Sequence, residues 1–171
     1  MRARQMLHSL LPLLLLAIAG CGSAPTGPLA AGDRVPEIQV ASLSGEMISL
    51  AGTPGQAVWI SFWASWCAPC REEWPDINAA AQDLGPAVRI VAVAVNEPPA
   101  TVAAFVADHP ADFSVALDPE GALAERFGVI GFPTHILIDG DGVLQRVVRG
   151  PLDGQRAADL LGLPLARGDG L

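Results

Sequence analysis

The sequence predicts an α/β fold in which a central mixed β-sheet is flanked by helices. Apolar runs at residues 57–64 and 88–95 have the composition of strands that are buried on both faces. Helical segments separate such runs, and this alternation implies parallel strands joined by right-handed crossovers. Gly140-Asp141-Gly142 indicates a late hairpin, which adds antiparallel strands. With 171 residues and an apolar fraction of 51%, the chain suits one domain.

Each element has its own local signal. Two short alternating segments in residues 37–50 flank Ser44-Gly45 and predict an N-terminal hairpin. A helix over 68–84 should stop at Gly85-Pro86, and Asp153 is the expected N-cap of the last helix. The other expected elements are, in order, a strand at 88–95, a helix at 100–109, a strand at 113–118, a helix at 120–128 ending at Gly128, strands at 134–139 and 143–150, and a helix at 153–162.

The N-terminal residues have the pattern of an export signal. Arg2 and Arg4 precede a leucine-rich run, which is too short for a comfortable membrane span of about 20 residues. Ile18-Ala19-Gly20-Cys21 resembles a bacterial lipobox, which implies that the chain is cut before Cys21 and that its thiol carries a lipid. Acyl chains on Cys21 would anchor the protein to a membrane.

These observations divide the chain into four parts. Residues 1–20 are expected to be a lipoprotein signal peptide, and residues 21–32, rich in Gly, Pro and Ala, a flexible tether. Residues 33–163 form the expected domain, and residues 164–171 a loose tail. Export places the domain outside the cytoplasm, where disulfides persist.

The charge of the chain argues against one class of partner. The formal net charge is -8, and every basic residue is an arginine. Removal of the leader takes away two of the 10 basic residues, so that 8 basic and 18 acidic residues leave a charge of -10. A body this acidic repels phosphate backbones, and we expect no nucleic-acid partner.

Cys67 and Cys70 remain as the two cysteines of the predicted domain. They can pair with each other, with a partner protein or with a metal, although His109 and His135 are isolated and no further cysteine pair is present to complete a zinc site. Cys67 falls at the expected helix N-terminus, where free N–H groups and the helix dipole stabilise a thiolate. We therefore expect Cys67 to be exposed and to attack, and Cys70, one turn later, to be shielded and to resolve the mixed disulfide.

The segment "FWASWCAPC", Pro75 and "GFPT" together resemble the thioredoxin superfamily, most closely the membrane-anchored TlpA/ResA-type thiol-disulfide oxidoreductases. The resemblance covers residues 33 to about 163 and implies a thioredoxin-like fold, a redox-active Cys67–Cys70 disulfide and a TlpA/ResA-type insertion around residues 88–108. It also implies that Pro133 is a cis-proline facing the cysteine pair. The substrate would bind at Trp66, Phe132, Pro133 and Thr134, with the Phe132 backbone pairing with an incoming peptide.

The resemblance also indicates a proton carrier. Thioredoxin itself has a buried Asp six residues before its first cysteine, where this chain has Ser61. The TlpA/ResA group instead has a Glu three residues after the second cysteine, which Glu73 matches. Glu73 would accept the proton of Cys70 during resolution and return it on the reverse path. Glu97 is a further expected influence on the electrostatics of the site, whereas His135 is expected to be a core or sheet-surface residue.

The implied function is reduction of disulfides in exported proteins. Family substrates include apocytochromes c and copper-site proteins of respiratory oxidases, and a membrane thiol relay would supply the electrons. We expect a monomer that needs no cofactor and no metal. Two alternatives remain: a peroxiredoxin-like thiol peroxidase, although its usual Pro-x-x-x-Thr pattern is absent, and a copper-binding chaperone of the same superfamily.

Overall fold

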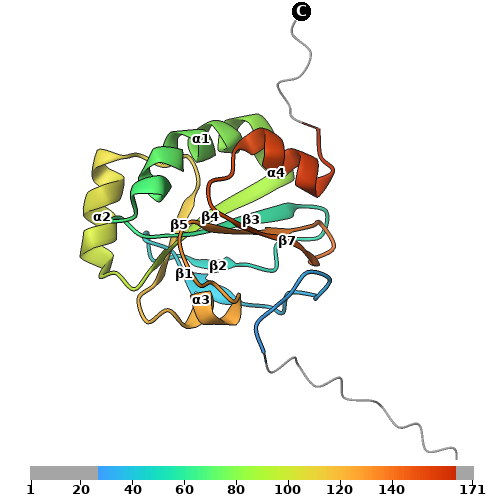
Figure 1. Cartoon of the computed structure of the whole chain (residues 1–171), viewed down its shortest axis with the longest axis horizontal. Coiled ribbons are helices and arrows are strands. Elements are labelled where there is room, and N and C mark those ends of the chain that lie inside the picture. The colour runs from blue at the N-terminus through green and yellow to red at the C-terminus, as the bar shows by residue number, and fades with distance from the viewer. Residues whose placement is uncertain (1–26, 165–171) are drawn as a thin grey trace, which may run out of the picture.

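The computed structural model describes residues 27–164 (Figure 1). The predictions for the signal peptide, Cys21, the first part of the tether and the end of the tail lie outside these residues. The helices and strands are β1 (Gln39–Ala41), β2 (Met47–Ser49), β3 (Ala57–Trp63), α1 (Ala68–Leu84), the 3-10 turn η1 (Gly85–Ala87), β4 (Val88–Val95), α2 (Pro99–Asp108), β5 (Ser114–Asp118), α3 (Ala122–Arg126), β6 (Thr134–Ile138), β7 (Leu144–Arg149) and α4 (Gly154–Leu161).

The central sheet is mixed and has the strand order β5-β4-β3-β6-β7. Strands β3, β4 and β5 are parallel, whereas β6 runs antiparallel to β3 and β7 antiparallel to β6. The N-terminal hairpin β1-β2 forms a separate small sheet. The predicted α/β class, element order and two hairpins are therefore confirmed.

Strand β3 lies in the middle of the sheet and divides the core into two layers. Its even-numbered residues, Val58, Ile60 and Phe62, face the layer that contains the β1-β2 hairpin and α3. Its odd-numbered residues, among them Trp59 and Trp63, face the layer covered by α1, α2 and α4 (Figure 1). Every residue of β3 is buried, which explains why this strand reads as a continuous apolar run instead of an alternating one.

Helix α1 agrees with its predicted bounds and carries the residues of the site. Cys67 is its N-cap and Gly85, with a φ of 51°, follows its last residue. Helix α3 is shorter than expected because it ends at Arg126, before Gly128. Asp153 caps α4 as predicted, and its side chain accepts a hydrogen bond from the N–H of Arg156 at 2.8 Å.

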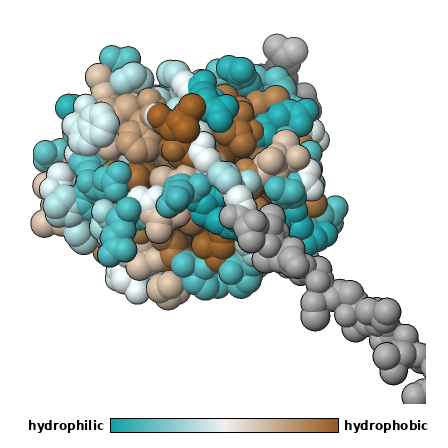
Figure 2. All heavy atoms as spheres, turned by 60° about the horizontal axis from the view of Figure 1, so that its bottom comes forward, coloured by the Kyte–Doolittle hydropathy of each residue, from teal (hydrophilic) through white to brown (hydrophobic). Residues whose placement is uncertain are grey.

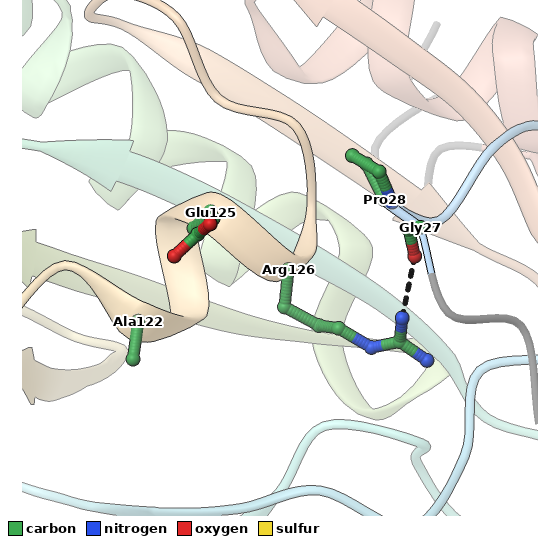
Figure 3. A pocket seen from close by; sticks show the side chains of 5 residues that line it. All are labelled: Gly27, Pro28, Ala122, Glu125 and Arg126. Atoms are coloured by element: carbon green, nitrogen blue, oxygen red, sulfur yellow. Dashed lines mark hydrogen bonds between the residues drawn. The ribbon is translucent and has the colours of Figure 1, made fainter.

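The domain begins earlier than the predicted boundary at residue 33. Leu29 is 3% exposed and belongs to the core layer of α3. Its N–H donates to the carbonyl of Arg126 at 2.9 Å, and the Arg126 guanidinium donates to the Gly27 carbonyl at 2.6 Å (Figure 3). Residues 27–32 therefore pack on the domain instead of extending from it, because one leucine among the Gly, Pro and Ala residues finds an apolar site beside α3.

Within residues 27–164, no helix has both the length and the apolar character required to cross a membrane.

Candidate active site

Cys67 and Cys70 form a disulfide at the start of α1, with their Cα atoms 5.3 Å apart. The N–H of Cys70 points at the Cys67 sulfur, 3.4 Å away. The sequence produces this arrangement because β3 ends at Trp63 and a short turn brings Cys67 to the N-cap, where Pro69 fits the first helical turn without losing a hydrogen bond. The Cys70 N–H at the helix N-terminus is therefore directed at the Cys67 sulfur, a position where an anion is stabilised.

The two cysteines differ in solvent exposure, although less than the sequence suggested. Cys67 keeps 5% of its surface exposed and Cys70 only 1%. The expectation that Cys67 is exposed is thus corrected for the oxidised state: it is buried, and it reaches the surface through a groove. Trp66 and Phe132 flank this opening with their rings edge to face at 5.9 Å.

The Cys67 groove has a volume of about 510 Å³ and is largely apolar. It runs from Cys67 past the end of β4 to α3 and the loop before β6, and is lined by Trp66, Cys67, Val95, Asn96, Gly121, Ala124, Glu125, Val129, Ile130, Gly131 and Phe132. Ile130 is 84% exposed and Trp66 69%, both unusually high for large apolar side chains. Apolar side chains reach the surface on the molecular face that carries α3 (Figure 2).

The loop before β6 has the expected cis peptide between Phe132 and Pro133. The Pro133 carbonyl accepts from the N–H of Gly150 at 2.9 Å, whereas Phe132 makes no backbone hydrogen bond with any of residues 27–164. Thr134, a predicted substrate contact, is 1% exposed and its hydroxyl donates to the Gly131 carbonyl at 2.7 Å. Its side chain is therefore bonded within the loop, and a contact of Thr134 with a substrate stays a prediction.

Glu73 projects from α1 into the core and is 4% exposed, while its neighbour Glu72 is exposed. The Glu73 Oε2 atom accepts from the N–H of Leu152 at 3.3 Å and lies 3.3 Å from Nε2 of His135. His135 is fully buried, and its Nδ1 accepts from the Trp59 indole N–H at 3.1 Å. The expected position of Glu73, one turn from Cys70 on the buried helix face, is thus observed.

The contact of Glu73 with His135 is new relative to the sequence interpretation. His135 pairs with Ser61 across β3 and β6, so the two side chains share a sheet face. That face is the one covered by α1, because Trp59 and Leu137, which also lie on it, contact the helix layer. The alternation of side chains along β6 alone does not tell which sheet face His135 occupies. The register with β3 and the position of α1 are needed to identify Glu73 as its neighbour.

Glu97 lies just after β4 and is 5% exposed. Its carboxylate accepts from both the N–H and the hydroxyl of Ser65, the former at 2.7 Å. Ser65 belongs to the turn between β3 and α1, two residues before Cys67, so Glu97 holds the turn that leads to Cys67. The structure thus gives Glu97 a bonding partner near Cys67, and its electrostatic influence on the site stays a prediction.

Among the described residues, no three His, Cys, Asp or Glu side chains are grouped so that they could hold a metal ion.

Comparisons with known proteins agree with this geometry. Residues 31–147 match the family model described as the AhpC/TSA family. The chain is 35% identical over 124 residues to the thiol-disulfide oxidoreductase ResA of Bacillus thuringiensis subsp. konkukian, an alignment that covers 70% of this chain and 69% of that protein.

Solved structures are similar over most of their length. A putative thiol:disulfide interchange protein DsbE from Chlorobium tepidum superposes with a TM-score of 0.68 at 33% identity, covering 76% of this chain and 92% of the other. The pneumococcal exposed lipoprotein thioredoxin Etrx1 from Streptococcus pneumoniae superposes with a TM-score of 0.68 at 25% identity, covering 74% and 98%.

Proposed function

Because the chain belongs to the AhpC/TSA family and is a thiol-disulfide oxidoreductase of the ResA type with a thioredoxin-like fold, we propose that it reduces disulfides in exported proteins outside the cytoplasm. The observation that carries the proposal is the Cys67–Cys70 disulfide at the N-terminus of α1, with one sulfur opening on an apolar groove.

The proposed reaction starts from the reduced pair. The Cys67 thiolate attacks one sulfur of a substrate disulfide, forms a mixed disulfide and releases the other substrate sulfur as a thiolate. Cys70 then gives its proton to the Glu73 carboxylate and attacks Cys67, which releases the second substrate sulfur and regenerates the intramolecular disulfide. The substrate gains two electrons, which the pair loses, and its two released thiolates take up protons from Glu73 and from solvent. A separate dithiol must therefore reduce the pair again.

The Cys67 groove is suited to hold the substrate during this exchange. Trp66, Phe132 and Ile130 offer apolar contact beside the attacking sulfur. The backbone groups of Phe132, which have no backbone partner among the described residues, are available to pair with an extended peptide segment. This combination favours an unfolded or flexible cysteine-containing segment over a small-molecule thiol.

The proposed substrates are exported proteins with oxidised cysteines, such as apocytochromes c or copper-site proteins, and the proposed electron donor is a membrane thiol relay. A reducing potential is expected, near the roughly -270 mV of thioredoxin and far from the roughly -120 mV of DsbA. Redox equilibration with glutathione measures it, and a value near that of DsbA would argue for the opposite direction.

We further propose that lipidation of Cys21 anchors a monomeric domain to the outer face of a membrane. The lipobox-like sequence supports this proposal, as does the similarity to a pneumococcal protein described as an exposed lipoprotein. Wild-type full-length chain should partition into detergent after expression in bacteria, and the Cys21→Ala variant should not. Equal partitioning of the two would remove the anchor, and gel filtration of the domain tests the monomer.

The reaction itself is tested by trapping. Cys70→Ala should accumulate protein partners as mixed disulfides through Cys67, because the resolving sulfur is missing. Cys67→Ala is the matched control and should trap none, since Cys70 is 1% exposed. Trapping by Cys67→Ala alone would reverse the two roles, and identification of the trapped partners would name the substrate and the donor.

The two alternatives have direct tests. A thiol peroxidase would consume hydrogen peroxide at the expense of a thiol donor, and a copper chaperone would bind copper stoichiometrically in the reduced domain. Peroxide turnover faster than reduction of a protein disulfide, or tight copper binding that Cys67→Ala abolishes, would favour the respective alternative.

A further inference from the structure

Three buried side chains are linked by polar contacts beneath the start of α1, and the proposed reaction uses only one of them, Glu73. They are Trp59 on β3, His135 on β6 and Glu73 on α1, whose exposed fractions are 0%, 0% and 4%. The indole N–H of Trp59 donates to His135 Nδ1 at 3.1 Å, and His135 Nε2 lies 3.3 Å from Glu73 Oε2. Three elements therefore bring these side chains together beneath the start of α1.

The Trp59 contact fixes the state of His135. An indole nitrogen can only donate, so His135 Nδ1 must be the acceptor and carry no proton. The proton of the neutral imidazole is then on Nε2, the atom that faces Glu73. His135 cannot relay a proton onward while Trp59 occupies Nδ1, and it presents one N–H to the carboxylate.

The surroundings leave His135 no alternative partner among residues 27–164. Nε2 has no aligned hydrogen bond in this oxidised state, and Glu73 Oε2 is the acceptor within reach. The neighbouring strands offer Val148 and the Ser61 hydroxyl, which has no hydrogen-bond partner among residues 27–164, while the loop before α4 contributes the Leu152 N–H. Among these neighbours of His135, Glu73 is the titratable side chain.

We propose that His135 is a positioning residue that holds Glu73 as a carboxylate ready to accept the Cys70 proton. The inference rests on the proposed function and assigns a role that no motif of the sequence carries. His135 Nε2 lies 3.3 Å from Oε2, and the Leu152 N–H donates to the same oxygen at 3.3 Å. Donors this close to a buried carboxylate offset the cost of burying its charge. Without the imidazole, the Leu152 N–H would be the one hydrogen-bond donor to Glu73 among residues 27–164, and the buried charge would be less well compensated.

The test follows the resolution step by stopped flow. Reduced full-length chain carrying Cys21→Ser is mixed with the disulfide reagent dithiobis(nitrobenzoate). Attack by Cys67 releases one coloured thiolate, and resolution by Cys70 releases the second. His135→Leu removes the donor and should move the pH midpoint of the second phase upward by about one to two units. His135→Gln places an amide N–H near the position of Nε2 and should restore most of the wild-type profile.

A double-mutant cycle separates this role from a structural one. In a Glu73→Gln background, His135→Leu should cause no further shift, since the imidazole acts through Glu73. Independent shifts in the two variants, or an unchanged midpoint in His135→Leu, would overturn the inference. If neither coloured phase appears even in the wild type, the proposed function fails instead.

The state of His135 is also measurable without a His135 variant. Imidazole nitrogen chemical shifts in the wild type should report the neutral ring with its proton on Nε2. Trp59→Phe should produce a mixture of tautomers, because Nδ1 loses its donor. A wild-type ring that is protonated at neutral pH, or that carries its proton on Nδ1, contradicts the inference whatever the stability of the variants.

Discussion

At the scale of single residues, the described part of the chain buries three acidic side chains, Glu73, Glu97 and Asp118. Each carboxylate has backbone N–H donors: Glu73 from Leu152, Glu97 from Ser65, and Asp118 from Leu123 and Ala124. A buried carboxylate is tolerated only with such partners. Glu97 follows β4 and Asp118 accepts from the start of α3, two elements that line the Cys67 groove, while Glu73 lies one turn after Cys70. Local polar bonding therefore supports the residues around the site.

Glu97 allows a direct test of that statement. Glu97→Ala removes the acceptor of two Ser65 hydrogen bonds, and we expect it to lower the free energy of unfolding by about 2 kcal/mol. Glu97→Gln is the matched control, since its amide oxygen still accepts the Ser65 N–H, and it should lose less than half as much. Urea unfolding of the oxidised proteins measures both, and equal losses would mean that the charge, not the bonding pattern, stabilises the turn.

At the scale of elements, helix α1 carries Cys67 at its N-terminus and packs firmly against the sheet and α2 along its length. Trp74 on α1 packs against Trp63 of β3 and Phe105 of α2, with ring centroids 4.5 and 5.1 Å apart. Its indole N–H donates to the His109 carbonyl at 3.2 Å. These contacts hold the helix against the sheet and so help to keep the Cys70 N–H directed at the Cys67 sulfur.

The start of α1 should therefore make Cys67 unusually reactive. In the Cys70→Ala variant, iodoacetamide should alkylate Cys67 about tenfold faster at neutral pH than it alkylates free cysteine, because a larger fraction is thiolate. Carrying out the measurement in a Cys21→Ala background excludes the other thiol. A rate equal to that of free cysteine would show that the helix start does not activate the sulfur.

At the scale of the whole molecule, the N-terminal segment of the domain and the Cys67 groove both involve helix α3. Gly27 and Leu29 dock on Arg126 of α3, and Ala124 and Glu125 of the same helix line the Cys67 groove. Six residue steps separate Cys21 from Gly27, and an extended chain covers at most about 3.5 Å per step. A lipid on Cys21 would thus keep the groove close to the membrane, as expected for exchange with a membrane donor.

The docked N-terminal segment should contribute measurably to stability. Leu29→Ala leaves a cavity in the core layer of α3 and should lower the free energy of unfolding by about 2 to 4 kcal/mol. Met47→Ala is the control, since Met47 is 61% exposed and a surface truncation should stay within about 0.5 kcal/mol. Similar small losses in both variants would show that residues 27–32 form part of the tether after all.

Local signals explain why most elements were predictable. The end of α1 followed from Gly85-Pro86, and the β6-β7 hairpin from its central glycines. Thr134 illustrates the opposite case: its place beside Pro133 suggested a substrate contact, but its hydroxyl satisfies the Gly131 carbonyl inside the loop. A motif gives a position along the chain, and side-chain partners depend on what packs there.

The sequence by itself determined the fold class, the order of the elements and the placement of Cys67 and Cys70 at a helix start, because periodicity, caps and turn residues act over a few neighbours. Only the tertiary structure decided that Glu73 faces His135, that Glu97 holds the Ser65 turn and that Leu29 belongs to the core. These contacts join residues 32 to 97 positions apart, and they depend on strand register and helix docking, which are set by packing of the whole domain.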